Sequence, residues 1–398
     1  MSIDRPATLV DYSAQARHEQ DGVQAGGCEM MTAHADVVGS LLRPSWLLEA
    51  RERRATEKIT AAELEAVEDR AVDAAVALQE QVGLQVVTDG EMRRLSFQTQ
   101  MVEAVDGFGA WDMDAFLWGG WHGDAVVGDR AVERPGDLGV VDKLVRRRYL
   151  SAAEFAYLRE RTTRTAKGTL PSPSLWANFW SADRSRAAYP TLDGFLADVV
   201  DILRQEVAEL VRLGATYIQL DAPHYTAMLE PETRSFYEGQ GWTLDRWLSR
   251  GIELDNAVIA GFPQITFGLH LCRGNQDSRW LNRGGYDAIA GPIFRGSGAQ
   301  RLLLEYDDER SGSFEPLREV PEDKTVVLGL ITTKSPRQET TGELVARVRE
   351  AGRQIAVDRL ALSPQCGFST SVLGNRITVE DQRRKLQLLV DAARQIWR

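Results

Sequence analysis

Apolar residues recur at helical spacing in three segments of the chain, and each segment stops at a glycine before a short apolar run begins. Helices are therefore expected at about residues 60–83, 192–214 and 340–352. The first opens with Thr60 and Glu63, the pair that forms a capping box at a helix N-terminus. Strands are predicted directly after these helices, in the runs LQVVTDGE, ATYIQLD and DRLALSPQCG.

Further apolar runs bring the predicted strands to eight. They lie at residues 35–40, 166–170, 265–271, 301–305 and 325–331, and a last helix is expected behind the cap formed by Thr378 and Asp381. Alternating strands and helices imply a parallel sheet with right-handed crossovers. Eight such units in about 360 residues predict an α/β fold, a closed (β/α)8 TIM barrel, with a doubly wound open sheet as the competing arrangement.

Two segments fall outside this repeating plan. Residues 1–34 show no clear period and are expected to form an N-terminal extension without identifiable chemistry, so that the barrel domain spans residues 35–398. Residues 97–163 contain several Gly and Trp and are predicted as an insertion after the second strand. In a barrel such an insertion lies on the C-terminal face, where it can serve as a lid.

Composition narrows the classes of function. The chain has 43% hydrophobic and 26% charged residues, and its net charge of −11 argues against a nucleic-acid surface. The only dense basic run, Arg146 to Arg148, is expected to be a solvated helix edge. Without a membrane-length apolar run or a signal-peptide pattern, and with three cysteines, the chain is expected to be soluble and cytoplasmic, as a monomer or an oligomer.

Candidate metal ligands stand at the ends of three predicted strands. His270 and Cys272 are two apart on one strand, so their side chains point to the same side, and Cys366 follows the last strand. Each also has an ordinary structural interpretation, as a buried thiol or a hydrogen-bonded core imidazole. Glu305 closes the sixth strand as a ligand, a partner of a ligand or a helix cap, and the ligand role is favoured. Zn2+ accepts this mixture of nitrogen, sulfur and oxygen donors.

Other polar residues end strands as well. Asp89 and Asp221 can be explained by turn chemistry and Lys334 by solvation, but barrel enzymes collect their catalytic groups from the ends of several strands. Trp176, after the third strand, is also predicted to contact substrate. The full set of predicted catalytic and substrate-binding residues is Ser40, Glu91, Trp176, Asp221 and Lys334.

Six motifs resemble, in order, the catalytic barrel of cobalamin-independent methionine synthase and its single-barrel relatives, from about residue 35 to the C-terminus. They read GSLLRP, TDGEMRR, YIQLDAPH, HLCRGN, TTKSPR and SPQCGFST. The resemblance implies that Ser40 holds a substrate carboxylate and that Glu91 and Asp221 hold its amino group, which favours homocysteine. It also implies zinc, joined by the substrate thiol, on His270, Cys272, Glu305 and Cys366.

Two departures from that family concern the methyl donor. The methionine synthases proper have a second, N-terminal barrel that helps bind the folate donor, and this chain is too short to contain it. Lys334 stands where that family has a histidine thought to assist proton transfer to the donor. Single-barrel relatives are thought to use a methyl-corrinoid protein or, in the epoxyalkane:coenzyme M transferases, an epoxide. The donor is therefore methyltetrahydrofolate, a methyl-corrinoid protein or an epoxide.

The predicted function is zinc-dependent S-methyl or S-alkyl transfer to a homocysteine-like thiol, with Lys334 stabilising the leaving atom. The alternative is an epoxide:thiol transferase of the coenzyme M type. The anionic sulfonate of its thiol substrate would then contact Lys334, Lys167, Arg43 or Arg93. A zinc hydrolase is less favoured, because two thiolate ligands make zinc a poorer Lewis acid. A non-catalytic metal-storage protein would have no use for the strand-end carboxylates.

Overall fold

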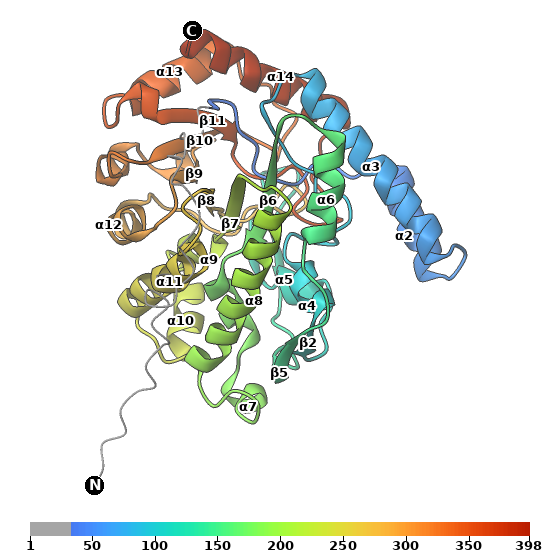
Figure 1. Cartoon of the computed structure of the whole chain (residues 1–398). Coiled ribbons are helices and arrows are strands. Elements are labelled where there is room, and N and C mark those ends of the chain that lie inside the picture. Colours follow the sequence, from blue (N-terminus) through green and yellow to red (C-terminus); the bar gives the residue numbers. More distant parts are fainter. Residues whose placement is uncertain (1–32) are drawn as a thin grey trace, which may run out of the picture.

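The computed structural model describes residues 33–398. A curled, seven-stranded parallel sheet forms its centre, and the helices lie around it (Figure 1). The strands after β1 follow one another in sequence order without the reversal of a doubly wound sheet, which confirms the predicted barrel-type fold. Their order is β1 (Val86–Val87), β6 (Thr165–Pro171), β7 (Tyr217–Asp221), β8 (Thr266–Leu271), β9 (Arg301–Glu305), β10 (Thr325–Ile331) and β11 (Leu360–Pro364).

The segment before Leu41 lies between the two edge strands of this sheet, β1 and β11, and connects them by hydrogen bonds. Asp36 N donates to the Leu362 carbonyl of β11 at 2.8 Å, and Leu41 N donates to the Gly90 carbonyl beyond β1 at 3.0 Å. The predicted strand at 35–40 is reduced to a single bridge at Ala35, because its later backbone groups bond to side chains and to a loop instead of a neighbouring strand. The predicted extension, apart from its last two residues, lies outside the described residues.

The predicted helices are confirmed as α3 (Ala61–Gln81), α8 (Leu192–Arg212), α13 (Thr341–Ala351) and α14 (Val379–Ile396). Helix α8 buries Val199, Leu203 and Leu210, which recur at helical spacing, against the body of the protein. Helices α2 (Ser45–Ala55) and α3 form an arm that projects from the body in Figure 1. The remaining helices between β6 and α13 are η1 (Pro173–Phe179), α7 (Ala182–Ser185), α9 (Pro223–Ala227), α10 (Pro231–Gly239), α11 (Leu244–Ile259), α12 (Asp287–Gly296), η2 (Glu309–Ser311) and η3 (Glu315–Glu319); η4 (Val357–Arg359) precedes β11.

The capping box at α3 gives a stability prediction. Glu63 N donates to the Thr60 hydroxyl at 3.2 Å, and Thr60 N donates to the Glu63 carboxylate at 2.8 Å. Thr60→Ala is expected to lower the free energy of unfolding by about 1 kcal/mol in urea denaturation, because a backbone donor loses its partner. Thr60→Ser keeps the hydroxyl and serves as control; equal stability of the two variants would contradict the prediction.

The chain between β1 and β6 builds two small antiparallel ribbons. Helix α6 (Ala152–Arg161), at its end, packs on β6, α3 and α8 as a barrel helix does. The division of the chain at 97 and 163 stays a prediction. The run Arg146 to Arg148 was predicted to lie at the edge of a helix. Instead Arg146 is the last residue of a strand, and Arg147 and Arg148 follow it and are exposed. The other elements here are α4 (Thr99–Ala104), β2 (Val105–Phe108), α5 (Asp114–Leu117), β3 (Gly119–Trp121), β4 (Arg130–Val132) and β5 (Val140–Arg146).

A buried ionic cluster occupies the end of the sheet where the strands begin. The carboxylate of Asp36 accepts from Tyr217 at 2.8 Å and from Lys167 at 3.1 Å, and lies 3.3 Å from the Arg301 guanidinium. Burial alone would raise the pKa of Asp36, but the charges of Lys167 and Arg301 hold it below its ordinary value. The cluster therefore joins the segment before Leu41 to three strands.

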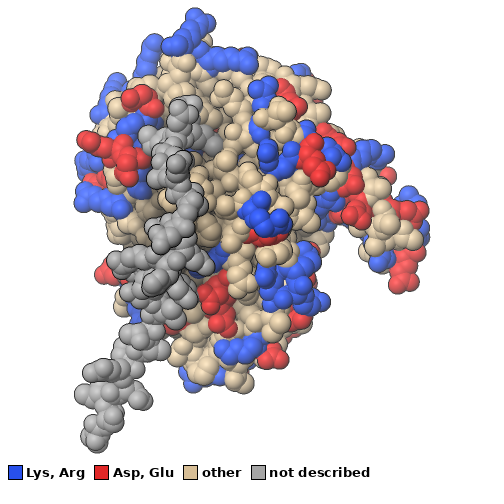
Figure 2. Space-filling view, viewed as in Figure 1, with Lys and Arg blue, Asp and Glu red and all other residues tan. Residues whose placement is uncertain are grey.

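The surface carries both signs of charge. Figure 2 shows Lys and Arg interspersed with Asp and Glu on the face it presents, including the projecting arm. Among the helices that the structure describes, none has the length and apolar character needed to cross a bilayer.

Candidate active site

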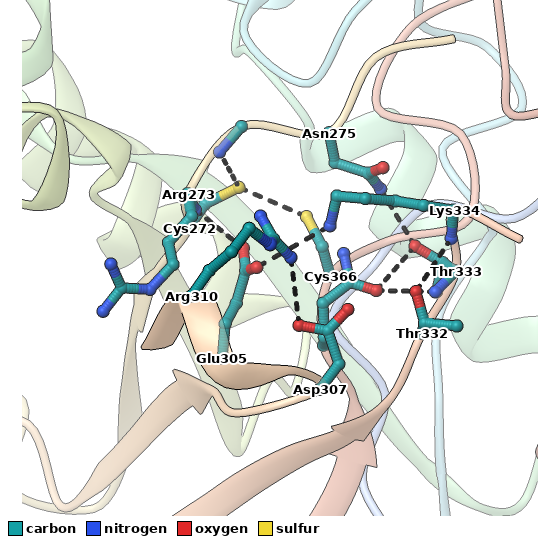
Figure 3. A network of polar contacts seen from close by, with 12 residues as sticks. Cys272, Arg273, Asn275, Glu305, Asp307, Arg310, Thr332, Thr333, Lys334 and Cys366 are labelled. Carbon is teal, nitrogen blue, oxygen red and sulfur yellow. Dashed lines mark hydrogen bonds and ion pairs between the residues drawn. The ribbon is translucent and has the colours of Figure 1, made fainter. Parts of the chain in front are cut away.

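Four residues predicted as metal ligands meet at the C-terminal ends of the strands. His270 lies on β8 and Cys272 directly after it, Glu305 ends β9, and Cys366 follows β11. One donor atom from each of the four lies within 4.8 Å of all the others. Figure 3 shows Cys272, Glu305 and Cys366 converging, and the two sulfur atoms are 3.3 Å apart as free thiols. The structure thus brings together residues up to 96 positions apart in sequence, although their role as ligands stays a prediction.

Two of these donor atoms have no hydrogen-bond partner among the described residues. His270 Nδ1 faces the Leu303 carbonyl at 3.3 Å, which assigns the proton to Nδ1 and leaves the buried Nε2 as a free acceptor. Glu305 Oε1 accepts from Arg273 N at 2.7 Å, while the buried Oε2 is 3.8 Å from Lys334 Nζ and accepts no hydrogen bond. Unpaired buried acceptors are costly, and a cation between them would remove that cost.

The ionisation of the cluster also fits a cation. Burial, together with the charges of Lys167 and Lys334, lowers the pKa of His270 to about 3, so its imidazole is neutral. The hydrogen bond with Cys366 and burial raise the pKa of the Cys272 thiol, and burial raises that of Glu305. Protein groups alone therefore oppose the charged thiolate and carboxylate that a divalent cation stabilises. One imidazole, two thiols and one carboxylate form a zinc-type donor set.

A cavity of about 150 Å³ opens beside the cluster. His270, Cys272 and Cys366 lie in its wall, so the donor atoms adjoin the space where a ligand would bind. Three predicted substrate residues line the same cavity, namely Ser40, Glu91 and Asp221. The segment between β1 and β6 contributes further wall residues, including Leu117, Trp118 and Trp121.

Glu91 is held in a fixed position in this wall. Its backbone has a φ of 55°, a left-handed conformation that a glutamate adopts only when surrounding contacts impose it. Thr169 Oγ1 donates to Glu91 Oε1 at 3.0 Å, and Arg94 Nη1 lies 3.3 Å from the same oxygen. The other oxygen, Oε2, is buried and has no partner among the described residues. A side chain at Gly39 would displace this carboxylate, because a Cβ atom there would lie 2.8 Å from Glu91 Oε1.

Asp221 and Ser40 complete the polar wall. Gln219 Nε2 donates to Asp221 Oδ1 at 2.7 Å. Burial, and after it the negative charge of Glu91, raise the pKa of Asp221 to about 8, so the cavity disfavours the ionised carboxylate. Ser40 Oγ accepts from Ser369 N at 3.3 Å, and a Cβ atom on Gly367 would lie 2.1 Å from that oxygen. Only glycine at 367 leaves Ser40 its place.

Two predicted site residues lie outside the cavity wall. Trp176 is fully buried behind it, where its ring contacts Phe108 and Phe179 at centroid distances of 5.5 and 5.1 Å. Lys334 is also absent from the residues that line the cavity, and its side chain extends toward Glu305 (Figure 3). Asp89 has a positioning role, since its Oδ1 accepts from Glu91 N at 2.9 Å.

Several wall residues were missed by the sequence analysis. They follow strand ends inside the quoted motifs, where the reasoning stopped at the first charged or metal-binding side chain. His224 lies three positions beyond Asp221 in YIQLDAPH, and Asn275 lies three beyond Cys272 in HLCRGN. Gln276 and Thr370 also line the cavity. The signal that was missed is that the loop after each strand lies on the same C-terminal face as the strand end, so polar residues in these loops can also line the site.

Comparison with known proteins places this site in a family. Residues 30–395 match the family described as the cobalamin-independent synthase, catalytic domain. The uncharacterized protein YxjH of Bacillus subtilis (strain 168) is 33% identical over 367 residues, 92% of this chain and 94% of that protein. The methionine synthase of Pyrococcus abyssi (strain GE5 / Orsay) is 27% identical over 92% of this chain and 93% of its own length.

The solved structures agree on the fold. A B12-independent methionine synthase from Shewanella sp. W3-18-1, in complex with selenomethionine, superposes with a TM-score of 0.68 at 21% identity, covering 92% of this chain and 98% of that one. The chain therefore belongs to the family of cobalamin-independent synthase catalytic domains. It is an enzyme of the methionine synthase type, as the six motifs predicted.

Proposed function

We propose that this enzyme transfers a methyl group to the sulfur of homocysteine or a close amino-acid thiol in a zinc-dependent reaction. One observation carries the proposal: three members of a four-residue, zinc-type donor set line the same cavity as the carboxylates of Glu91 and Asp221. This arrangement suits a small molecule with a thiol at one end and an ammonium group at the other.

The metal would be held by His270, Cys272, Glu305 and Cys366. Zinc bound at these residues supplies the positive charge that keeps a substrate thiol, with an ordinary pKa of about 8.5, ionised at neutral pH. Arg273 N donates to one Glu305 oxygen, which anchors the carboxylate and would leave its second oxygen available to the metal.

The ammonium group of the substrate would bind between the carboxylates of Glu91 and Asp221. Glu91 Oε2 is a buried acceptor without a partner in residues 33–398, and the negative charge of Glu91 contributes to the raised pKa of Asp221. An ammonium group would satisfy the free oxygen and offset that repulsion. Ser40 would contact the substrate carboxylate through its hydroxyl. Binding both ends fixes the sulfur for in-line attack on the methyl carbon.

A sulfonate-bearing thiol would need a cationic group that the described cavity wall does not present. Lys167 is buried in the ion cluster with Asp36, and Lys334 faces Glu305. Arg43 donates to backbone carbonyls, among them those of Ser369 and Glu91, and Arg93 pairs with Asp69. None of these four residues lines the cavity. An amino-acid thiol is therefore favoured over one of the coenzyme M type.

The test is a matrix of thiols and alkyl donors. Zinc-loaded enzyme is incubated with homocysteine or 2-mercaptoethanesulfonate, and with methyltetrahydrofolate, methylcobalamin or propylene oxide, and the S-alkyl product is measured by mass spectrometry. Methionine formed from homocysteine by the zinc-loaded enzyme, but not by the metal-depleted one, is the expected result. Product from the sulfonate thiol alone, or equal rates without metal, would overturn the proposal.

Asp221→Asn is expected to raise KM for homocysteine by roughly 10- to 150-fold, since a buried hydrogen bond to a charged group contributes about 1.5–3 kcal/mol. The matched control is a change of substrate: 4-mercaptobutanoate has the same chain and carboxylate but lacks the amino group. Steady-state kinetics should show that the variant loses its preference for homocysteine over this analogue. An unchanged preference would remove Asp221 from the ammonium site.

A further inference from the structure

A chain of buried polar groups leads from helix α11 to the cavity. Ser172 Oγ, just before η1, donates to Asp255 Oδ1 of α11 at 2.6 Å. Ser172 Oγ and Ser174 Oγ are 3.3 Å apart, and Ser174 Oγ is 2.8 Å from His224 Nε2 of α9. Each of these four side chains is at most 1% exposed. Hydroxyl groups at such spacing can pass a proton by reversing their hydrogen bonds.

His224 ends this chain at the cavity. It lines the cavity, and its Nδ1 is buried without a hydrogen-bond partner among the described residues. The rings of Tyr225 and Tyr237 pack near it, at centroid distances of 4.2 and 6.4 Å. Burial lowers the pKa of His224 to about 3, so the imidazole carries one proton and no net charge. Which nitrogen holds that proton depends on Ser174.

Asp255 ends the chain on the other side. Its second oxygen accepts from Tyr225 OH at 2.7 Å, and no salt bridge reaches it within residues 33–398. Burial raises the pKa of Asp255 to about 7, although the hydrogen bonds from Ser172 and Tyr225 oppose that rise. A carboxyl group of this kind exchanges its proton near neutrality.

The two protonation states of Asp255 orient the chain in opposite directions. An ionised Asp255 accepts from Ser172, which accepts from Ser174. The hydroxyl of Ser174 then accepts from His224 Nε2–H, and Nδ1 carries the lone pair. A protonated Asp255 donates to Ser172, and the reversed order ends with Ser174 donating to Nε2, so that the ring proton of His224 stands on Nδ1.

We propose that His224 is a catalytic residue that gives a proton to the leaving nitrogen or oxygen of the alkyl donor, and that Asp255 supplies this proton through Ser172 and Ser174. The inference rests on the proposed methyl transfer to a thiol. It assigns the role of general acid to His224, which lines the cavity, and not to Lys334, which does not.

The reaction balances in atoms and charge. The sulfur forms a bond to the alkyl carbon, the bond from that carbon to the leaving atom breaks, and the electron pair stays on the leaving atom. That atom takes the proton of His224 Nδ1, while Nε2 takes one from Ser174. Ser174 regains a proton from Ser172, and Ser172 regains one from Asp255. The imidazole therefore never becomes a cation. The thiol releases one proton when it ionises, which equals the proton consumed.

The surroundings limit which other groups affect this transfer. The groups facing Asp255 are Ser172 and the phenol of Tyr225. Those facing His224 from the packed elements are Ser174 and the two tyrosine rings. The ionisable groups that share the cavity wall with it are Glu91, Asp221, Tyr237, His270, Cys272 and Cys366.

The relay is tested without any donor by 15N NMR of the histidine rings in the zinc-loaded enzyme, with His224→Gln assigning the signal. We expect His224 to stay neutral, with the proton on Nδ1 below about pH 7 and on Nε2 above it, following Asp255. Asp255→Asn should abolish this change of tautomer, while Asp198→Asn, which removes another tyrosine-bonded aspartate, should not. One tautomer at every pH, or a cationic imidazole, would overturn the relay.

The catalytic role is tested by comparing two donors. Methyltetrahydrofolate leaves as an amine that must gain a proton, whereas methylcobalamin leaves as cob(I)alamin without one. His224→Gln and Asp255→Asn are expected to slow transfer from methyltetrahydrofolate by about 10²–10⁴-fold, the usual contribution of a general acid. Transfer from methylcobalamin should slow by a much smaller factor, and zinc content should match that of the wild type.

The outcomes separate the two proposals. Equal losses with both donors, or no loss with methyltetrahydrofolate, would overturn the role of His224 while leaving thiol methylation intact. If the wild-type enzyme forms no methionine from homocysteine with any of the donors, the proposed function is overturned instead. The NMR result would still decide whether the relay exists.

Discussion

Cys366→Ser is expected to lower zinc affinity by more than about 100-fold and to abolish methyl transfer. The side chain is one of four converging donors, it lies 3.3 Å from the Cys272 sulfur, and it shares the cavity wall with the substrate residues. Even partners of metal ligands typically contribute about 10- to 100-fold to affinity, so loss of a ligand should cost at least as much. Metal content by mass spectrometry and methionine formation are the two measurements.

The third cysteine provides the control for this experiment. Cys28 lies outside the described residues, in the segment expected to carry no chemistry, and Cys28→Ser should leave zinc content and turnover at wild-type values. Circular dichroism shows whether each variant is folded. A Cys366→Ser enzyme that keeps its zinc and its activity would refute both the ligand assignment and the proposed function.

Asp36→Asn is expected to lower the free energy of unfolding by about 3–5 kcal/mol, the usual cost of removing one partner of a buried ion pair. The amide would leave Lys167 and Arg301, which are almost completely buried, without the carboxylate they share. The difference from wild type should shrink on acidification. Because the folded pKa of Asp36 is lowered, its contribution is present above the unfolded pKa of about 4 and is lost as the pH falls through the folded value.

Urea denaturation at neutral pH measures this effect. The control is Asp391→Asn on α14, where an exposed carboxylate lies 3.9 Å from Arg394, and which should change stability by less than about 1 kcal/mol. Equal stability of the two variants would show that the cluster does not hold the segment before Leu41 to the sheet.

The sequence predicted the fold well because local patterns and global arrangement agree. Capping boxes at α3, α13 and α14 and apolar spacing in α8 mark where helices begin, and these helices are confirmed. The segment at 35–40 misled the strand prediction, since its apolar character reflects burial in the closure of the sheet and not a regular ladder. A burial pattern alone does not distinguish these cases.

Residue type directed the site prediction to strand ends. His270, Cys272, Glu305 and Cys366 offer donor atoms that suit a metal, and the structure brings them together, while their role as ligands stays a prediction. Trp176 was misplaced because an aromatic residue after a strand can face either the cavity or the core, and packing decides. His224 was missed because its significance depends on Asp255, which is distant in sequence and ordinary in pattern.

The closure of the sheet has a consequence for synthesis. Phe368 N donates to the Ser40 carbonyl at 2.8 Å, so the first and last parts of the active site are built against each other across more than 300 residues. During translation the pocket has no complete wall until the residues around Cys366 and Gly367 have left the ribosome. A chain truncated before β11 therefore lacks Cys366, the neighbour of Ser40 and the closing edge of the sheet together.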